Sequence, residues 1–338
     1  MKKKKAIYRW LFILCAVGIT AWLNRYQLPR IRDALFRISP LLLITALLCS
    51  LLYFFWEGSI LTLLSRKYNR NFGRTDGITG AFFAQFYRML TLGSGTALSE
   101  IYYLHTKKIP AASATGMCLV QYLAQRMTIA FLGLLSGAYL FVNHPDLVLR
   151  HRFQIILSYS LALIVLGVIV FAGTCKRAVA RIFCFLELHL RQNSRFYANL
   201  FAIKQQVDLF QQACRELLLE KARLLRLFFL NILKLLCNMV IPAILLFQSE
   251  APEDFFLHMA LTGMAFVLAG VIPAPGGIGS LEWVFVLLFR GIVSTGTAAA
   301  AVIIYRLLTS MLPFLIGAVV SALYRSGEAG YGEFEHTL

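Results

Sequence analysis

Long apolar runs constrain this chain more than any other feature of its sequence. A helix needs about 20 mostly apolar residues to cross the roughly 30 Å hydrocarbon layer of a bilayer. Runs of about this length lie near residues 7–23, 41–64, 111–141, 153–174, 227–248 and 297–322. Hydrophobic residues make up 59% of the chain and charged residues only 14%, whereas soluble domains are roughly 45–50% apolar. The sequence therefore predicts an all-α, polytopic integral membrane protein with six spanning helices.

Two further apolar stretches, 77–105 and 255–289, are interrupted by residues that break helices. Glycine permits tight turns and proline ends a preceding helix. We predict that each stretch folds as a hairpin of two short helices, either re-entrant or fully spanning. Backbone at such a break cannot face lipid, so protein must cover it or it must line a wet cavity. The breaking residues are Gly93 and Gly95 in the first stretch, and Pro273, Pro275, Gly276, Gly277 and Gly279 in the second.

The two breaks belong to a longer internal echo. The first break leads to Glu100, and Arg126 follows 26 residues later in an apolar helix. The second leads to Glu282, and Arg306 follows 24 residues later. A Gly-Ala pair stands 11 residues after each arginine, at 137–138 and 317–318. Interrupted segments at corresponding places in two halves are typical of transporters whose substrate site lies at the membrane midplane.

The distribution of lysine and arginine predicts the orientation, because basic loops stay on the cytoplasmic side. Basic residues gather at the N-terminus, in 66–74, at 107–108, in 175–226 and at Arg325. A path with both termini in the cytoplasm satisfies all of these, and it makes the two repeats inverted. The arginine-rich loop 25–37 would then lie outside, against the rule. The first run carries no convincing cleavage site, so we expect an uncleaved helix rather than a signal peptide.

We predict one transmembrane domain, 1–338, with a first half 1–174, a connector 175–226 and a second half 227–338. Apolar residues repeat at helical spacing within the connector, at Val207, Phe210, Cys214 and Leu217. Two interpretations stay open for this segment. It is either an amphipathic helix lying on the cytoplasmic membrane surface or an ordinary helix that joins the halves.

Charged side chains at membrane depth are costly and are functional candidates by default. The cations are Arg88, Arg126, Lys234 and Arg306, and the anions are Glu57, Glu100 and Glu282. In one interpretation the two glutamates after the breaks pair with the two arginines and brace the hairpins. In the other, the arginines bind a phosphate bidentately and helix N-termini after the glycine breaks add backbone donors. The excess of one cation favours an anionic substrate. Glu57 pairs with Arg88 or reaches the headgroups.

A polar stripe runs along the helix predicted at 227–248. Asn231, Lys234 and Asn238 stand at i, i+3 and i+7, and therefore on one face. This face must contact protein or water, so it either lines a cavity or forms hydrogen bonds between helices. The predicted substrate-binding set consists of Glu100, Arg126, Lys234, Asn238, Gly276, Gly277, Gly279, Glu282 and Arg306.

The remaining features exclude several function classes. The net charge of +17 is spread over loops beside membrane helices, which favours anionic lipid headgroups over nucleic acid as partners. The seven cysteines show no metal-type spacing. No hydrolase triad or nucleotide-binding loop occurs, so we predict no enzymatic activity, no cofactor and no metal.

The segment from Pro273 to Glu282 reads PAPGGIGSLE. It resembles the PxPGGxGxxE signature of the membrane region of lysylphosphatidylglycerol synthase/flippases of the multiple peptide resistance factor type, and Arg306 matches the arginine that follows in that family. The segment 95–104 and Arg126 look like the first-half counterpart, with Ser99-Glu100 in place of the usual Pro and Gly-Glu. The resemblance implies a multi-pass protein of a bacterial-type inner membrane that moves or binds lipids. It also implies a stand-alone member without the aminoacyltransferase domain.

These features together predict a flippase-like or scramblase-like protein that handles a phospholipid or a polyprenyl-phosphate-linked lipid. Two alternatives belong to other classes. One is a non-transporting subunit that presents lipid to a separately encoded lipid-modifying enzyme. The other is a small-solute transporter. The sequence is also compatible with a homo-oligomer, in which a second copy of the chain is the partner.

Overall fold

The computed structural model of the chain describes residues 38–91, 93, 95–150, 152–189, 195–246, 255–272, 280–290 and 292–327. Regular structure in these ranges is helical, apart from one isolated β-bridge. Five segments are long and apolar enough to cross a membrane: Pro40–Ser65, Ala111–Asn143, Ile155–Thr174, Lys221–Leu246 and Thr297–Leu323. They confirm five of the six predicted spans. The run 7–23 and the arginine-rich loop after it lie outside the described residues.

Both interrupted stretches fold as two short helices, as predicted. The first gives α4, Arg74–Leu90, and α5, Thr96–Thr106. The second gives α12, Phe255–Val271, and α13, Ser280–Phe289. The prolines and glycines of the second break, 273–279, lie outside the described residues. Each pair of helices packs together.

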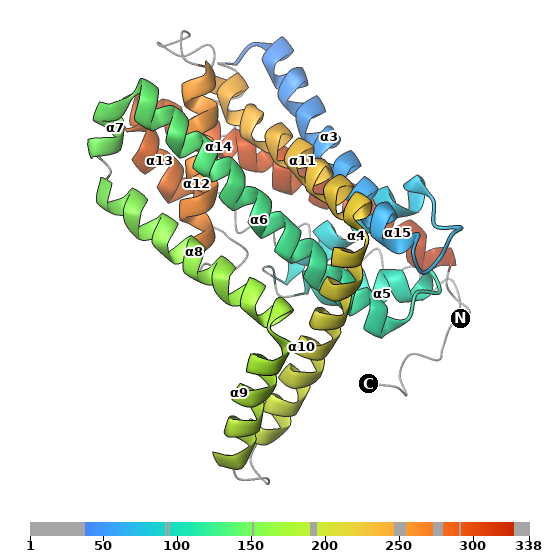
Figure 1. Cartoon of the computed structure of the whole chain (residues 1–338). Helices are drawn as coiled ribbons and strands as arrows, with labels where there is room; N and C mark the ends of the chain where they lie inside the picture. Colours follow the sequence, from blue (N-terminus) through green and yellow to red (C-terminus); the bar gives the residue numbers. More distant parts are fainter. Residues whose placement is uncertain are drawn as a thin grey trace.

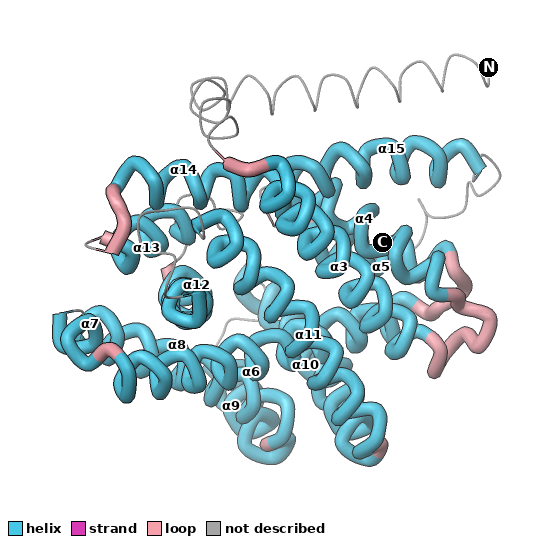
Figure 2. Tube along the Cα trace, turned by 90° about the horizontal axis from the view of Figure 1, so that it is seen from above, coloured by secondary structure: helices cyan, strands magenta, loops and turns pink. Residues whose placement is uncertain are grey.

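Two long helices form the centre of the bundle. α3, Pro40–Ser65, begins with proline in its first turn, where the missing N–H costs no hydrogen bond. It packs along α11, Lys221–Leu246. Figure 2 shows this pair between α14 and α15 on one side and α6 and α8 on the other. The central pair therefore contacts both halves of the chain.

Each hairpin also packs against a long helix from the other half of the chain. α6, Ala111–Asn143, contacts α12, and α15, Leu312–Gly327, contacts α4. Small residues allow this approach. A Cβ added to Gly317 on α15 would lie 2.3 Å from the carbonyl oxygen of Phe82 on α4, and one added to Gly263 on α12 would lie 2.3 Å from the Ser136 Oγ on α6.

The last span contains a local change of helix type. α14, Thr295–Arg306, is followed by one turn of π-helix, η2, Leu307–Met311, and then by α15. Pro313 at the start of α15 has no N–H to donate to the preceding turn. The Ser50 hydroxyl of α3 donates instead to the Leu308 carbonyl, at 2.7 Å. The widened turn is therefore satisfied by a neighbouring helix.

The first half of the chain ends with the short α7, Pro145–Arg150, and with α8, Arg152–Thr174. The connector then forms α9, Lys176–His189, and α10, Arg195–Leu219. α9 and α10 extend away from the bundle (Figure 1). Phe210 and Cys214 on α10 are buried in a core cluster with residues of α3 and α6. This packing favours the interpretation of α10 as a joining helix, because protein and not lipid covers its apolar face. Val207 is half-buried, and the side chain of Leu217 is not described.

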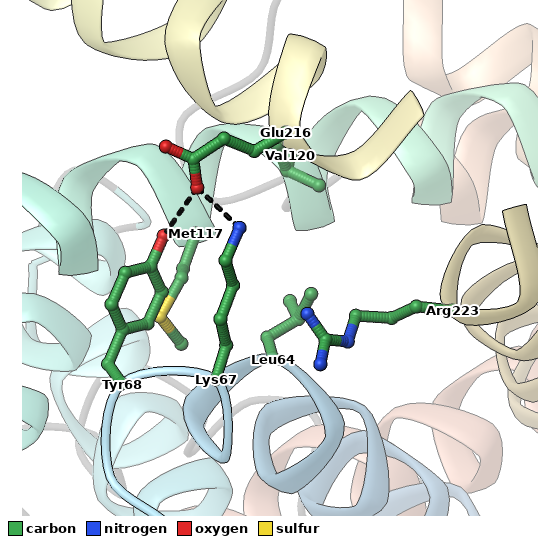
Figure 3. A pocket seen from close by; sticks show the side chains of 7 residues that line it. All are labelled: Leu64, Lys67, Tyr68, Met117, Val120, Glu216 and Arg223. Carbon is green, nitrogen blue, oxygen red and sulfur yellow. Dashed lines mark hydrogen bonds and ion pairs between the residues drawn. The ribbon is translucent and has the colours of Figure 1, made fainter. Parts of the chain in front are cut away.

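Polar contacts fasten α10 to the end of α3. The Glu216 carboxylate accepts hydrogen bonds from Lys67 and, at 3.4 Å, from the Tyr68 hydroxyl (Figure 3). Lys67 also lies 3.6 Å from Glu220, which pairs with Arg223 at 2.6 Å. This cluster joins the connector to the first half.

Candidate intramembrane site

The first glycine break ends α4 by a defined hydrogen-bond pattern. Gly93 has a φ of 94°, which glycine adopts without strain. Its N–H donates to the Arg88 carbonyl at 2.8 Å, a bond of the type that closes many helix C-termini. The Gly95 N–H donates to the Thr91 hydroxyl at 2.7 Å. The chain can then begin α5 at Thr96, one turn before Glu100.

Glu282 and Arg306 form an ion pair beside the second break. The Arg306 Nη2 donates to the Glu282 Oε2 at 2.8 Å, and Nε lies 2.5 Å from Oε1. The two side chains are 17% and 28% exposed. Glu282 stands in the first turn of α13, where the partial positive charge of the helix N-terminus also stabilises a carboxylate. The predicted pairing in the second repeat is confirmed.

The predicted pairing of Glu100 with Arg126 in the first repeat is wrong. Glu100 faces Cys118 on α6, and its Oε1 is buried without a hydrogen-bond partner. Arg126 stacks on the Tyr122 ring at 4.9 Å, and its Nη1 lies 2.9 Å from the position that a Cβ on Gly270 would occupy. Arg126 therefore reaches the last turn of α12, where helix carbonyls carry partial negative charge.

Lys234 binds Glu57, which the sequence did not indicate. The Lys234 side chain is 0% exposed, and its Nζ lies 2.7 Å from the Glu57 Oε2. Gln121 on α6 donates to the other carboxylate oxygen at 3.0 Å, and the ammonium lies 5.7 Å from the Tyr53 ring centroid. The suggestion that Glu57 pairs with Arg88 is wrong, because α11 and α6 bring Lys234 and Gln121 against α3.

The polar stripe of α11 faces the interior of the bundle. Asn231 is 0% exposed and donates to the Leu227 carbonyl of its own helix at 2.9 Å. The Oδ1 atoms of Asn231 and Asn238 are buried without partners. The stripe was predicted either to line a cavity or to form hydrogen bonds between helices. Lys234 does the second, because it binds Glu57 of α3.

Several of these groups lie close enough to influence one another electrostatically. Tyr53 interacts with Lys234, Glu57 and Arg88. Tyr305 interacts with Tyr53, Arg306 and Arg88, and Glu100 with Glu57 and Lys234. We call this set the charged belt: Tyr53, Glu57, Arg88, Glu100, Gln121, Lys234, Glu282, Tyr305 and Arg306.

The belt contains both paired and unpaired charges. Lys234 and Arg306 each bind a carboxylate, whereas Arg88 forms no ion pair within the described ranges, and neither does Arg126, which is not part of the belt. Gly276, Gly277 and Gly279 were predicted to join the site, but they lie outside the described residues. Sequence reasoning did not identify Tyr53 or Gln121 as neighbours of Glu57 and Lys234, because nothing in the sequence spacing shows which face of α3 meets α6 and α11.

Comparison with known proteins identifies one family. A family model described as "Lysylphosphatidylglycerol synthase TM region" matches residues 9–317. The match spans both halves, the connector and both arginine-bearing helices. No curated protein matches the sequence.

Proposed function

The chain belongs to the lysylphosphatidylglycerol synthase transmembrane-region family, and from that premise we propose that it moves phospholipid headgroups between leaflets, as a flippase or scramblase. The headgroup would pass the charged belt and Arg126 while the acyl chains stay in the bilayer. The lipid would be an anionic or zwitterionic phospholipid or a polyprenyl-phosphate-linked lipid. The observation that carries the proposal is the charged belt, which lies among helices long and apolar enough to cross a membrane.

The balance of free and paired groups supports a phosphate-bearing headgroup. Two guanidinium groups, Arg88 and Arg126, have no carboxylate partner among the described residues. Guanidinium groups bind phosphate oxygens bidentately. The Glu100 Oε1 is also without a hydrogen-bond partner, so a headgroup amine could bind there. An ion pair such as Glu282–Arg306 can open when phosphate competes for the arginine.

The packing of the hairpins supports an inverted repeat. α4, α5 and α6 correspond in order to α12, α13 and the helix from α14 to α15. The arginine-bearing helix of each half packs against the first hairpin helix of the other half, α6 on α12 and α15 on α4. Such reciprocal contacts are expected where two repeats rock against each other around a central site.

The basic loops support an orientation in the inner membrane. The loop after α3, the loop after α5 and the segment of α9 and α10 carry many of the lysines and arginines. We assign these loops, and both termini, to the cytoplasmic side. The α4–α5 hairpin would then enter from the cytoplasm and the α12–α13 hairpin from the other side.

The test is transfer of phospholipids with a fluorescent headgroup between leaflets of liposomes that contain the purified protein. We expect Arg306→Ala, Glu282→Ala and Arg126→Ala each to reduce the rate to that of protein-free vesicles. Arg150→Ala, on the exposed α7, is the matched control and should keep the wild-type rate. Size-exclusion profiles in detergent verify that the variants fold.

Other outcomes separate the alternatives. Wild-type transfer by the Arg306 and Glu282 variants would overturn the site assignment. Lipid retention without transfer would favour a subunit that presents lipid to another enzyme. Substrate-dependent uptake of a solute into sealed vesicles, with no lipid transfer, would favour a small-solute transporter.

A further inference from the structure

A groove of about 950 Å³ lies between the end of α3 and the start of α11. It is lined by Phe55, Trp56, Ser59, Thr62, Leu63, Arg66, Arg74, Glu220, Lys221, Ala222, Arg223, Arg226 and Leu230. Glu57 of the charged belt stands about 160° around the helix from the groove-lining face of α3, at 100° per residue. On α3, Glu57 of the belt therefore lies on the face opposite the groove.

The groove has an apolar part and a cationic part. Phe55, Trp56 and Leu63 of α3 and Leu230 of α11 form the apolar part. These residues belong to helices long and apolar enough to span a membrane. The five basic residues of the lining lie at or beyond the ends of these two helices, with Glu220 as the sole carboxylate of the lining. The two parts match the two ends of a lipid, because an acyl chain fits the apolar part and an anionic headgroup fits the cationic part.

Three of the five cations are available to a ligand. Arg223 pairs with Glu220 at 2.6 Å, and the Arg66 Nε donates to the Phe72 carbonyl at 3.1 Å. Arg74, Lys221 and Arg226 are exposed, and within the described residues none of them forms an ion pair. The neighbouring cluster in Figure 3 differs, because Lys67 there is already bound by Glu216. An anion is therefore attracted to the groove and not to that cluster.

Backbone groups add to this attraction. α11 begins at Lys221, after a break at Glu220. The Arg223 and Leu224 N–H groups bond to the Glu220 carbonyl, and Lys221 and Ala222, which line the groove, stand in the first turn of the helix. The partial positive charge at a helix N-terminus stabilises an anion.

We propose that this groove binds an anionic glycerophospholipid, with its phosphate among Arg74, Lys221 and Arg226 and one acyl chain along Phe55, Trp56 and Leu63. The site is occupied at equilibrium by a lipid of the leaflet next to the basic loops. The inference goes beyond lipid transfer, because it holds whether or not the protein moves lipids.

The test uses Trp56 as a reporter inside the groove. The chain has four tryptophans, and replacing Trp10, Trp22 and Trp283 by Phe leaves Trp56 alone. The protein is reconstituted with phosphatidylglycerol or phosphatidylcholine that carries bromine on an acyl chain, at equal mole fraction. We expect brominated phosphatidylglycerol to quench Trp56 with an apparent affinity at least about fivefold higher, the effect of one basic residue near a membrane surface.

Charge variants identify the residues responsible. The variant Arg74→Gln/Lys221→Gln/Arg226→Gln should quench equally with both lipids. The variant Lys176→Gln/Arg177→Gln/Arg181→Gln removes the same charge from exposed positions on α9 and should keep the preference. Arg74→Lys/Arg226→Lys should keep most of it, which separates charge from folding. Equal quenching of the parent protein by both lipids would overturn the proposal, and so would loss of preference in the α9 variant.

A soluble competitor distinguishes a lipid from a free phosphate. Excess glycerol 1-phosphate should not relieve quenching, because it lacks the acyl chain that the apolar part holds. Relief of quenching by this competitor would show that the groove takes a phosphate without a lipid, and would overturn the proposal.

Discussion

Lys234 shows at the scale of one residue how the bundle tolerates charge. It is 0% exposed and pairs with Glu57, whose side chain is 21% exposed. Removing one partner of a buried pair leaves an uncompensated charge and costs roughly 3–5 kcal/mol, whereas replacing both partners costs far less. The pair therefore specifies how α3 and α11 meet more than it stabilises the fold.

We predict that Glu57→Gln destabilises the protein by about 3 kcal/mol, the lower end of that range because Glu57 is partly exposed. Glu57→Gln/Lys234→Met should recover most of this loss. The measurement is thermal unfolding in detergent, followed by tryptophan fluorescence. The partly exposed pair of Lys67 and Glu216 provides the control. Lys67→Met should cost less than about 1 kcal/mol, because water already screens this pair. A double variant no more stable than Glu57→Gln would contradict the buried-charge argument.

Glu216 provides a pH-dependent contact between the connector and α3. The hydrogen bond from Lys67 holds the pKa of the Glu216 carboxyl below its ordinary value of 4.5. A depressed folded-state pKa gives stability that is present above pH 4.5 and is lost as the pH falls through the folded value. The contribution is less than about 1 kcal/mol, because the Lys67 and Glu216 side chains are 29% and 34% exposed.

We predict that Glu216→Gln lowers the unfolding temperature slightly at pH 6–7 and that this difference shrinks as the pH falls below 4.5, the ordinary pKa of a glutamate carboxyl, as the linkage requires. Unfolding scans of both proteins over that range measure it. Gln212→Ala controls for the smaller hydrogen bond that Glu216 accepts at 3.2 Å. A difference that grows on acidification would show that the sign is wrong.

At the scale of elements, the π-turn after Arg306 depends on a second helix. Pro313 cannot donate a hydrogen bond, and the Ser50 hydroxyl bonds to the Leu308 carbonyl at 2.7 Å in a buried position. We predict that Ser50→Ala costs about 1–3 kcal/mol, because it leaves a buried carbonyl unsatisfied. Ser59→Ala is the control, since that hydroxyl bonds only to Phe55 of its own helix. Equal unfolding temperatures for both variants would contradict this role.

The elements were largely predictable from the sequence and their contacts were not. Run length identifies the spans, and Gly93 and Gly95 mark the first hairpin, because both signals are local. The pairing of Lys234 with Glu57 depends on which faces of α3 and α11 meet, and so cannot be predicted from the spacing within either helix. Symmetry between the repeats correctly predicted Glu282 with Arg306, yet it failed for Glu100, whose carboxylate faces Cys118 on α6.

At the scale of the whole molecule, the two halves exchange contacts through their hairpins. α6 packs on α12 and α15 on α4. The connecting segments also lie toward two different ends of the bundle. In Figure 1, α7 and the start of α3 lie at one end, and α9, α10 and α5 lie toward the other. An inverted repeat requires that the two hairpins return to opposite sides of the membrane.

We predict which single cysteines react with an impermeant maleimide from each side, in a variant without the native cysteines. Asn71→Cys, Pro110→Cys and Arg181→Cys should be labelled only from the cytoplasmic side, because basic loops stay there. Asp146→Cys and Arg290→Cys should be labelled only from the opposite side. All five positions are exposed. Labelling is measured in sealed right-side-out and inside-out vesicles. A position labelled in one kind of vesicle should stay unlabelled in the other, so each kind is the control for the other. Arg290 follows the α12–α13 hairpin and Asn71 precedes the α4–α5 hairpin. Labelling of both positions from one side would therefore mean that the two hairpins enter from the same face of the membrane. Reciprocal rocking around the charged belt would then be impossible.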